Sequence, residues 1–401
     1  MFAVLSIASM SVFAVSVLAP EIAATADIAP AWIGAFMAIT YIGAMLAGTI
    51  TGNLVDRFGP IRVCQFTLLL AAVSLVVLSS AFWPLLALSA ALLGLAYGPL
   101  NPASAHILVQ LGSLRWRPLI FSVKQTGVPA GGALAGAVLP LLVALWDWRV
   151  AALSIAALAL LVLLLLQPLR ARFDQNRTTP RRLGLASVAG PIALVLSDPV
   201  LRHLTLVAFV YAGCQVSVGA FYVVYLVAAE GMTLSQAGSA FAFVQMGGIG
   251  GRLLWGSLAG RWINPRRLLA LIGLLTAASL FATTLIQPDW PFLLLAVQGL
   301  ILGASSFGWN GVFLSEAASL APAGRAGDTT GGVQFIMFGG VVVVPPLFGL
   351  LAGVSGSYAI AFYAVAAVAL SAVGFLLWDR NTINALLSPL YKPAFRCFRD
   401  F

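Results

Sequence analysis

Two basic side chains stand inside long apolar stretches of the sequence, where an ionised group is costly. Lys124 lies beside Gln125 and before Gly127, and Arg252 lies four residues before Gly256. Inside a membrane an ionisable side chain costs about 3 kcal/mol or more, so it is a functional hypothesis by default. A guanidinium group also matches the planar geometry of a carboxylate. Two such cations, with no obvious acid between them in the apolar runs, favour an anionic small-molecule ligand.

Each cation also has an alternative role that involves no ligand. Lys124 could extend its ammonium to the inner membrane surface, as long basic side chains do. Arg252 could hydrogen-bond backbone carbonyls as a packing or gate residue. The sequence leaves both alternatives open.

Neutral polar side chains in the apolar runs could complete a binding site. Each of them alone is as suited to bridging two helices as to contacting a ligand. The candidates are Tyr97, Asn101, Gln125, Tyr211, Gln215, Asn310 and Gln334.

Other chemistries find little support in the sequence. No arrangement of residues suggests catalysis, and there is no glycine-rich phosphate loop for ATP. The three cysteines are scattered and lack metal-ligand spacing. We therefore expect no enzyme activity, no metal and no cofactor.

The composition is that of an integral membrane protein. Of 401 residues, 61% are hydrophobic and only 8% are charged, against about 25% charged residues in soluble proteins. The net charge of +9 does not indicate a nucleic-acid partner, because the basic residues fall in short turns between apolar runs. The bilayer is the predicted environment.

A membrane helix needs about 20 mostly apolar residues, and twelve such runs occur. They lie at roughly 2–20, 31–54, 62–81, 84–111, 118–145, 149–168, 201–228, 236–258, 267–287, 291–319, 329–353 and 357–378. The predicted fold is all-α, with two pseudo-symmetric bundles of six helices. If the N-terminus is cytoplasmic, 18 of the 21 basic residues lie on that side, so we expect both termini in the cytoplasm.

The twelve runs divide into two equal halves. We expect a first bundle at 1–168, a polar cytoplasmic linker at 169–200, a second bundle at 201–378 and a basic cytoplasmic tail at 379–401.

A charged hairpin recurs in both halves. The first copy reads G-x-x-x-D-R-x-G-x-x-R from Gly52 to Arg62, with Asp56 and Arg57 at its centre. The second begins at Gly256 and keeps Arg261 but has Gly260 in place of the acid. Corresponding hairpins in two halves indicate a duplicated membrane protein. We expect Gly52, Asp56, Arg57, Arg62, Arg261 and Glu316 to act as gating residues, with Glu316 near Arg261, Arg266 or Arg325.

With this motif after the second helix and twelve helices split six and six, the chain resembles the major facilitator superfamily over essentially its whole length. The resemblance implies that helices 5 and 8 are neighbours, so Lys124 and Arg252 would approach one cavity from opposite halves. Family members that carry monocarboxylates or oxalate also place an arginine in helix 8 before the hairpin. Cavity-lining helices 1, 4, 7 and 10 favour Tyr97, Asn101, Tyr211, Gln215 and Asn310.

The resemblance has two further implications. Asp56 would face the N-terminus of helix 11, near Asp328 and Thr329, and close the cytoplasmic side. Helix 5 is similar to the family's antiporter motif, but Pro129-Ala130-Gly131-Gly132 is one residue short of P-x-x-G-G. That departure gives no support to antiport.

The leading hypothesis is a monomeric inner-membrane secondary transporter for a small organic anion, with a proton as coupling ion. Proton-driven efflux of amphiphilic compounds is the first alternative, but it predicts a buried acid in the first half, and none is found. A non-transporting receptor or scaffold is the second alternative. It predicts that Lys124 and Arg252 can be neutralised without effect.

Overall fold

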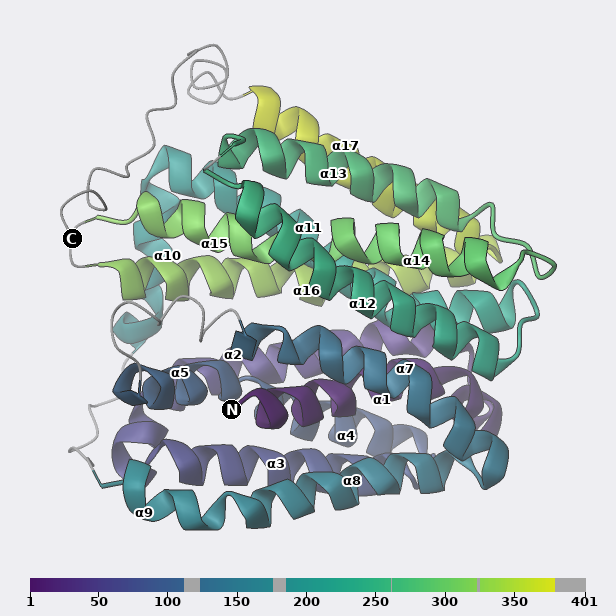
Figure 1. Cartoon of the computed structure of the whole chain (residues 1–401), viewed down its shortest axis with the longest axis horizontal. Coiled ribbons are helices and arrows are strands. Elements are labelled where there is room, and N and C mark those ends of the chain that lie inside the picture. The colour runs from purple at the N-terminus through teal and green to yellow at the C-terminus, as the bar shows by residue number, and fades with distance from the viewer. Residues whose placement is uncertain (112–122, 176–184, 261, 323–324, 379–401) are drawn as a thin grey trace.

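The computed structural model describes residues 1–111, 123–175, 185–260, 262–322 and 325–378. Within these ranges the chain is helical almost throughout and contains no β-strand. The helices form two bundles that lie one above the other in Figure 1, with α1 to α9 below and α10 to α17 above. The predicted all-α fold is confirmed.

The lower bundle is built from the first half of the chain. Its helices are α1 (Phe2–Ala26), α2 (Ile33–Phe58), α3 (Pro60–Leu78), α4 (Trp83–Tyr97), α5 (Leu100–Leu111), α7 (Gly127–Leu145), α8 (Trp148–Leu165) and the short α9 (Arg170–Phe173). Two single turns, η1 (Pro30–Trp32) and η2 (Gln167–Leu169), precede α2 and α9.

The upper bundle repeats this arrangement after a connecting helix. Its helices are α10 (Leu185–Ser197), α11 (Pro199–Ala228), α12 (Leu234–Leu258), α13 (Pro265–Thr283), α14 (Phe292–Ser306), α15 (Asn310–Ser319), α16 (Ala326–Ser355) and α17 (Tyr358–Trp378).

Eleven spans in the described part of the chain are long and apolar enough to cross a membrane. α12 is not among them, although its 25 residues are sufficient in length, because glycines, glutamines and Arg252 interrupt its apolar run. It packs between α7 and α14 and serves as the twelfth helix.

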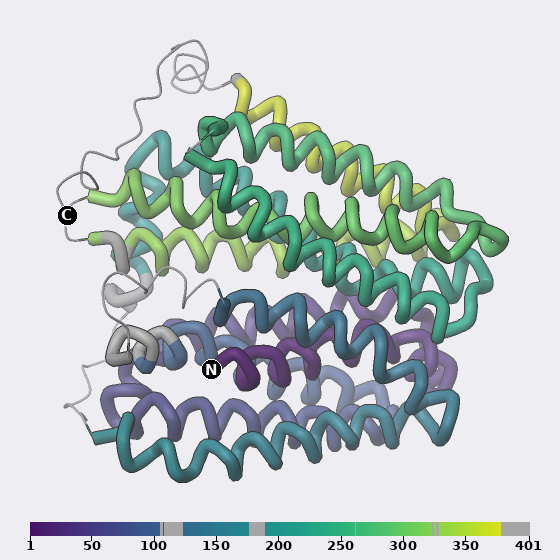
Figure 2. The backbone as a smooth tube through the Cα atoms, viewed as in Figure 1, coloured from purple at the N-terminus to yellow at the C-terminus, as the bar shows by residue number. Residues whose placement is uncertain are grey.

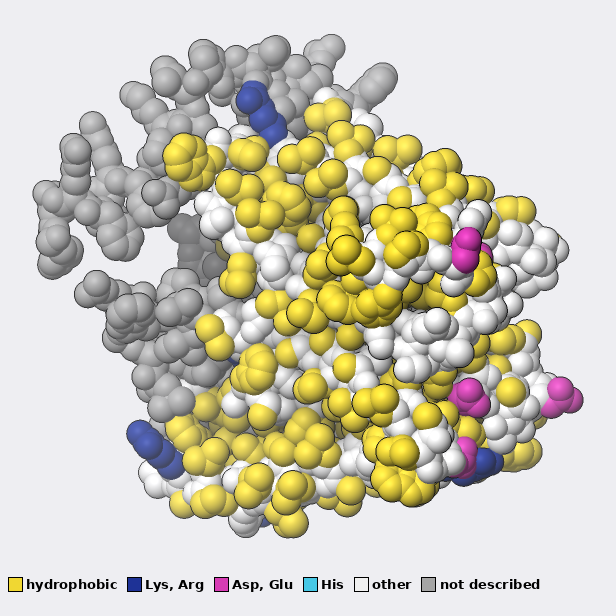
Figure 3. Space-filling view, turned by 45° about the vertical axis from the view of Figure 1, so that its right-hand side comes forward, with side chains coloured by type: hydrophobic (Ala, Val, Ile, Leu, Met, Phe, Trp, Pro, Cys, Tyr) yellow, Lys and Arg dark blue, Asp and Glu magenta, His cyan; other side chains and the backbone are white. Residues whose placement is uncertain are grey.

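Large apolar side chains are exposed on the outside, among them Leu293 and Val354. Figure 3 shows apolar side chains spread over the face of the molecule. A surface of this kind is suited to contact with lipid.

Two helices that the sequence predicts to be continuous are broken. The run 84–111 divides into α4 and α5 at Gly98 and Pro99, and the run 291–319 divides into α14 and α15 at residues 307–309. Proline at 99 removes a backbone donor. Both breaks fall in the fourth helix of a bundle and are followed by an asparagine, Asn101 or Asn310. Broken backbone at membrane depth occurs where protein or a cavity surrounds it.

Other helix ends also differ from the predictions. α1 continues through Pro20 to Ala26. Residues 118–122 of the predicted fifth helix lie outside the described residues, and a turn at Thr126 separates the helical residues 123–125 from α7.

The segment predicted as a polar linker contains a helix, α10, that packs on α16 and α11. A Cβ atom added to Gly332 of α16 would overlap the carbonyl of Pro191, so the two backbones are in direct contact. Before it, Asp174 accepts hydrogen bonds from the backbone nitrogens of Ile61 at 2.8 Å and Arg62 at 3.2 Å. The two described parts of this segment therefore contact different bundles, which Figure 2 shows as two separate groups of helices.

Candidate functional site

The two bundles meet along a seam where α7 lies against α12. A Cβ atom added to Gly136 would lie 2.5 Å from the carbonyl oxygen of Gly238, and one added to Gly238 would lie 2.6 Å from that of Gly136. Neither position can take a side chain while the helices keep this distance. Small residues permit such close helix packing in lipid. The seam therefore brings the fifth and eighth helices together, as the family resemblance implies.

Lys124 points into the protein and not to a membrane surface. Its side chain is 4% exposed. The ammonium donates to Oδ1 of Asn101 at 3.0 Å and to Oγ of Ser104 at 3.1 Å, both on α5. The lysine is thus attached to the segment that follows the break in the fourth helix. Ser104 is missing from the sequence-based set, because a lone serine in an apolar run gives no distinct signal.

Arg252 joins the two bundles through backbone oxygens. Its Nη1 donates to the carbonyl of Gln125 at 2.8 Å, and its Nε donates to the carbonyl of Phe307 at 3.2 Å. Gln125 ends the short helical stretch before α7, and Phe307 is the C-cap of α14. Carbonyls at helix ends lack their usual intrahelical donor. The arginine therefore supplies donors to two helix ends, one in each bundle.

The two predicted cations lie close to one another through Gln125, which follows Lys124 in the chain and accepts from Arg252. Both oxygens that bind Arg252 are neutral. Arg252 therefore hydrogen-bonds backbone carbonyls, which is the alternative role considered for it from the sequence. No acid is among these two partners to balance its positive charge.

A cavity of about 40 Å³, which we call the central cavity, is lined by residues of both bundles. It has room for about three waters, at roughly 10–15 Å³ for each. Its walls come from α1, α2, α4, α7 and α11, and its lining residues include no acid. The polar members are Ser9, Ser16, Tyr41, Tyr97 and Gln215. Val128 and Phe307 also line it, and they place it next to the carbonyls that hold Arg252.

Two of these residues could have been found from the sequence but were not. Ser9 and Ser16 are seven residues apart in a mostly apolar helix, so they share one face. The hydroxyl of Ser16 is fully buried and has no hydrogen-bond partner among the described residues. A buried hydroxyl in that condition is uncommon and calls for an explanation such as a ligand or water.

A cluster of three side chains stands at the α11 wall of the cavity. Oε1 of Gln215 accepts from Nε1 of Trp309 at 3.1 Å and from Nδ2 of Asn310 at 2.9 Å. Gln215 and Asn310 are predicted site residues, and the structure brings them into direct contact. Trp309, which precedes Asn310 in the chain, joins them through its indole nitrogen.

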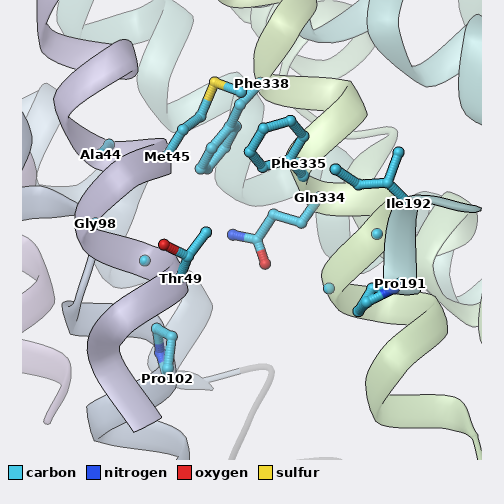
Figure 4. Close-up of a pocket in the computed structure, with 13 residues that line it drawn as sticks. Ala44, Met45, Thr49, Gly98, Pro102, Pro191, Ile192, Gln334, Phe335 and Phe338 are labelled. Carbon is cyan, nitrogen blue, oxygen red and sulfur yellow. The ribbon is translucent and has the colours of Figure 1, made fainter. Parts of the chain in front are cut away.

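A second, larger cavity of about 190 Å³ lies nearer the hairpin between α2 and α3. Figure 4 shows Gln334 of α16 extending toward Thr49 of α2, with Phe335 and Phe338 above it and Pro191 and Ile192 of α10 on the far side. We call it the seam pocket. Gln334 lines this pocket and not the central cavity. Tyr41 of the central cavity contacts Phe338 of the seam pocket edge to face at a centroid distance of 5.4 Å, so this aromatic pair lies between the two spaces.

Tyr211 does not line either cavity. It is buried within the upper bundle, and its hydroxyl donates to the carbonyl of Leu269 at 2.9 Å. Its ring meets that of Trp309 at 5.7 Å in a T-shaped contact. The structure therefore places Tyr211 among packing residues, behind the site.

The predicted gating residues of the first hairpin are only loosely held in this structure. Gly52 has open space around it, Arg62 is exposed, and exposed Arg57 lies 5.1 Å from the ring centroid of Phe58. Half-buried Asp56 makes no ion pair with another described residue. The acid that meets the start of α3 is Asp174 instead. Gating by this hairpin stays a prediction.

In the described part of the second hairpin, Arg266 forms an ion pair with Glu316. Glu316 of α15 accepts from Nε of Arg266 at 2.9 Å, and each side chain is 13% exposed. Arg261 lies outside the described residues. Of the three arginines considered for Glu316, the structure therefore pairs it with Arg266.

Comparisons with known proteins give a consistent result. A family model described as "Major Facilitator Superfamily" matches residues 1–339, while no curated protein matches the chain. Among solved structures, the nucleoside transporter NupG is similar with a TM-score of 0.76 at 13% identity, over 94% of this chain and 98% of that one. The peptide transporter POT in complex with sulfate has a TM-score of 0.72 at 17% identity, over 94% and 92%. A bacterial homologue of the human lysosomal transporter Spinster, in an inward-facing and occupied conformation, has a TM-score of 0.68 at 15% identity, over 94% of this chain and 93% of that one.

Proposed function

Because the chain belongs to the Major Facilitator Superfamily, we propose that it is a secondary active transporter for a small organic anion such as a carboxylate. The observation that carries this proposal is Arg252, which lies beside Lys124 and, among the residues that the structure describes, donates to the neutral carbonyls of Gln125 and Phe307. Transport proceeds by alternating access, with the two bundles rocking around the central cavity.

A carboxylate can replace a carbonyl as the partner of Arg252. A guanidinium–carbonyl bond carries charge on one partner only, whereas a carboxylate adds the opposite charge and can accept two parallel N–H groups, so an arriving anion competes well with the carbonyl of Gln125. Releasing that carbonyl removes a contact between the bundles. The ligand thus binds one arrangement of the seam better than the other, which is what a ligand-driven conformational change requires.

The cavities suggest a route for the anion. From the central cavity it passes the contact between Tyr41 and Phe338 and enters the seam pocket, where Gln334 and Thr49 supply polar contacts. On this route the neutral residues Tyr97 and Gln215 bind the substrate in the central cavity. Asn101 holds Lys124 in place, and Asn310 holds Gln215.

A proton is the proposed coupling ion. Moving one negative charge into a cell against a membrane potential costs about 2.3 kcal/mol per 100 mV, and a co-transported proton removes that cost. We place the protein in the inner membrane as a monomer, with both termini and the Asp56–Arg62 hairpin on the cytoplasmic side, where basic loops concentrate. The hairpin and the Glu316–Arg266 pair would then stabilise the cytoplasmically closed state.

Uptake by proteoliposomes tests the proposal. We expect Lys124→Ala and Arg252→Ala each to abolish uptake of labelled acetate, lactate and oxalate with the protein still folded by thermal melting. Arg149→Ala is the matched control, because that arginine is partly exposed and pairs with Asp147 at 3.4 Å, away from the seam. Anion uptake that survives both replacements would refute the proposed function.

A further inference from the structure

The amide of Gln215 is held in one orientation by two donors. The indole nitrogen of Trp309 can only donate, and Nδ2 of Asn310 also only donates. Both reach the same oxygen, Oε1 of Gln215, at 3.1 and 2.9 Å. Turning the amide over would point its NH₂ group at two donors and lose both hydrogen bonds. The oxygen of Gln215 is therefore fully engaged on the protein side.

Trp309 is itself fixed by its neighbours. It is 1% exposed, and its ring packs against Tyr211 at 5.7 Å and Phe313 at 5.6 Å. Tyr211 is anchored in turn through its hydroxyl to the carbonyl of Leu269. These contacts leave the indole N–H little freedom to point anywhere but at Gln215.

The NH₂ group of Gln215 is left for the cavity. Gln215 is half-buried and lines the central cavity, and its Nε2 has no acceptor among the residues that the structure describes. The other polar groups there are the hydroxyls of Ser9, Ser16, Tyr41 and Tyr97, which can donate by rotating. A ligand that offers acceptors satisfies this wall, whereas one that offers an N–H donor leaves Gln215 unmatched.

We propose that Gln215 is a donor-only recognition residue for an acceptor group on the substrate, and that Trp309 is the positioning residue that fixes its orientation. This inference rests on the proposed anion transport and adds a site for the substrate end that Arg252 and Lys124 do not hold. The proposal narrows the substrate class to anions that carry a second oxygen-bearing group in addition to one carboxylate. Hydroxy acids, keto acids and dicarboxylates are examples.

A double-mutant cycle on uptake tests the inference. Gln215→Met keeps the length of the side chain and removes its donors, so we expect the KM for lactate and oxalate to rise about tenfold or more. Trp309→Phe keeps the ring packing and removes only the N–H, so we expect a rise of several-fold. The variant with both changes should equal Gln215→Met alone, because Trp309 acts through Gln215. Acetate, which has no second acceptor, should show a much smaller change in KM.

The outcomes separate this inference from the proposed function. Suppose that the wild-type protein takes up lactate or oxalate. If Gln215→Met and Trp309→Phe then change KM additively, or change the KM for acetate equally, the role of Gln215 is overturned and anion transport stands. Wild-type protein that takes up none of the three anions would overturn both. Gln215→Glu gives an independent check on folding, because its carboxylate still accepts from Trp309 and Asn310. It should retain the wild-type melting temperature and lose anion uptake, and full uptake by this variant would also overturn the inference.

Discussion

The contact between α7 and α12 allows a matched pair of substitutions on one helix. In Gly238→Ala the new Cβ atom would lie 2.6 Å from the carbonyl oxygen of Gly136 and would overlap the ring of Pro140. Ordinary contact begins at 3.4 Å, so the seam has to widen by at least about 0.8 Å (3.4 − 2.6), and the closer contact with Pro140 requires more. In Gly250→Ala, also on α12, the Cβ atom meets nothing within 4 Å. The two variants therefore differ in packing and not in chemistry.

The expected size of the difference follows from these distances. Overpacking of a well-packed interface costs typically about 1–3 kcal/mol, while alanine gains roughly 1 kcal/mol over glycine in a helix at both positions. The difference between the variants is then about 1–3 kcal/mol, and it falls only on the state in which the seam is closed. That corresponds to about a 5- to 150-fold shift between closed and open seam.

A cysteine at position 128 can report the shift. Val128 lines the central cavity beside the seam, and Val128→Cys can be introduced after the three native cysteines are replaced. We expect a hydrophilic maleimide to modify this cysteine about 5- to 150-fold faster in Gly238→Ala than in Gly250→Ala. Transport should slow only in Gly238→Ala. Equal reaction rates in the two variants would refute the view that this glycine contact holds the seam closed.

Three further predictions concern other contacts. Phe338→Ala removes the ring that meets Tyr41, joins the two cavities, and should raise passive efflux of lactate from preloaded proteoliposomes; efflux at the wild-type rate would contradict that role. Asp174→Ala removes the acceptor at the start of α3, so we expect the free energy of unfolding to fall by about 1–2 kcal/mol. The melting temperature should drop, and Asp174→Asn should restore part of it. Glu316→Gln should destabilise the protein when Arg266 is present and have little effect in an Arg266→Met background, because the two form one ion pair; purely additive changes in melting temperature would argue against coupling.

The sequence was sufficient for the architecture because lipid imposes simple demands. Long apolar runs, basic turns and a repeated hairpin predict the all-α duplicated fold, and the structure confirms it. The breaks in the fourth and tenth helices were missed, because a hydropathy pattern does not distinguish a continuous helix from two shorter ones. Proline 99 marked only the first break, and the second depends on packing around Gly308, which lies against Trp255.

The residues of the candidate site could be singled out from the sequence, but their contacts could not, and their role in binding stays a prediction. Lys124 and Arg252 stand out because charge in an apolar run is unusual, and the structure places both at the seam. Their partners could not be read from sequence, since backbone carbonyls such as that of Phe307 carry no residue signature. Tyr211 shows the opposite error, because an aromatic hydroxyl suited to a ligand is equally suited to a neighbouring carbonyl. Asp174, a linker residue by its position, caps α3 only because the chain returns to that point.

The connection between the bundles limits the proposed rocking motion. Asp174 binds the start of α3 in the lower bundle, and α10, which begins at Leu185, packs on α16 of the upper one. The ten residues 175–184 that join them span at most about 35 Å when fully stretched. The number of residues in this segment therefore sets an upper limit on the distance between Asp174 and Leu185. Lengthening the segment should leave transport unaffected, while a sufficient shortening should hold the carrier in a single state.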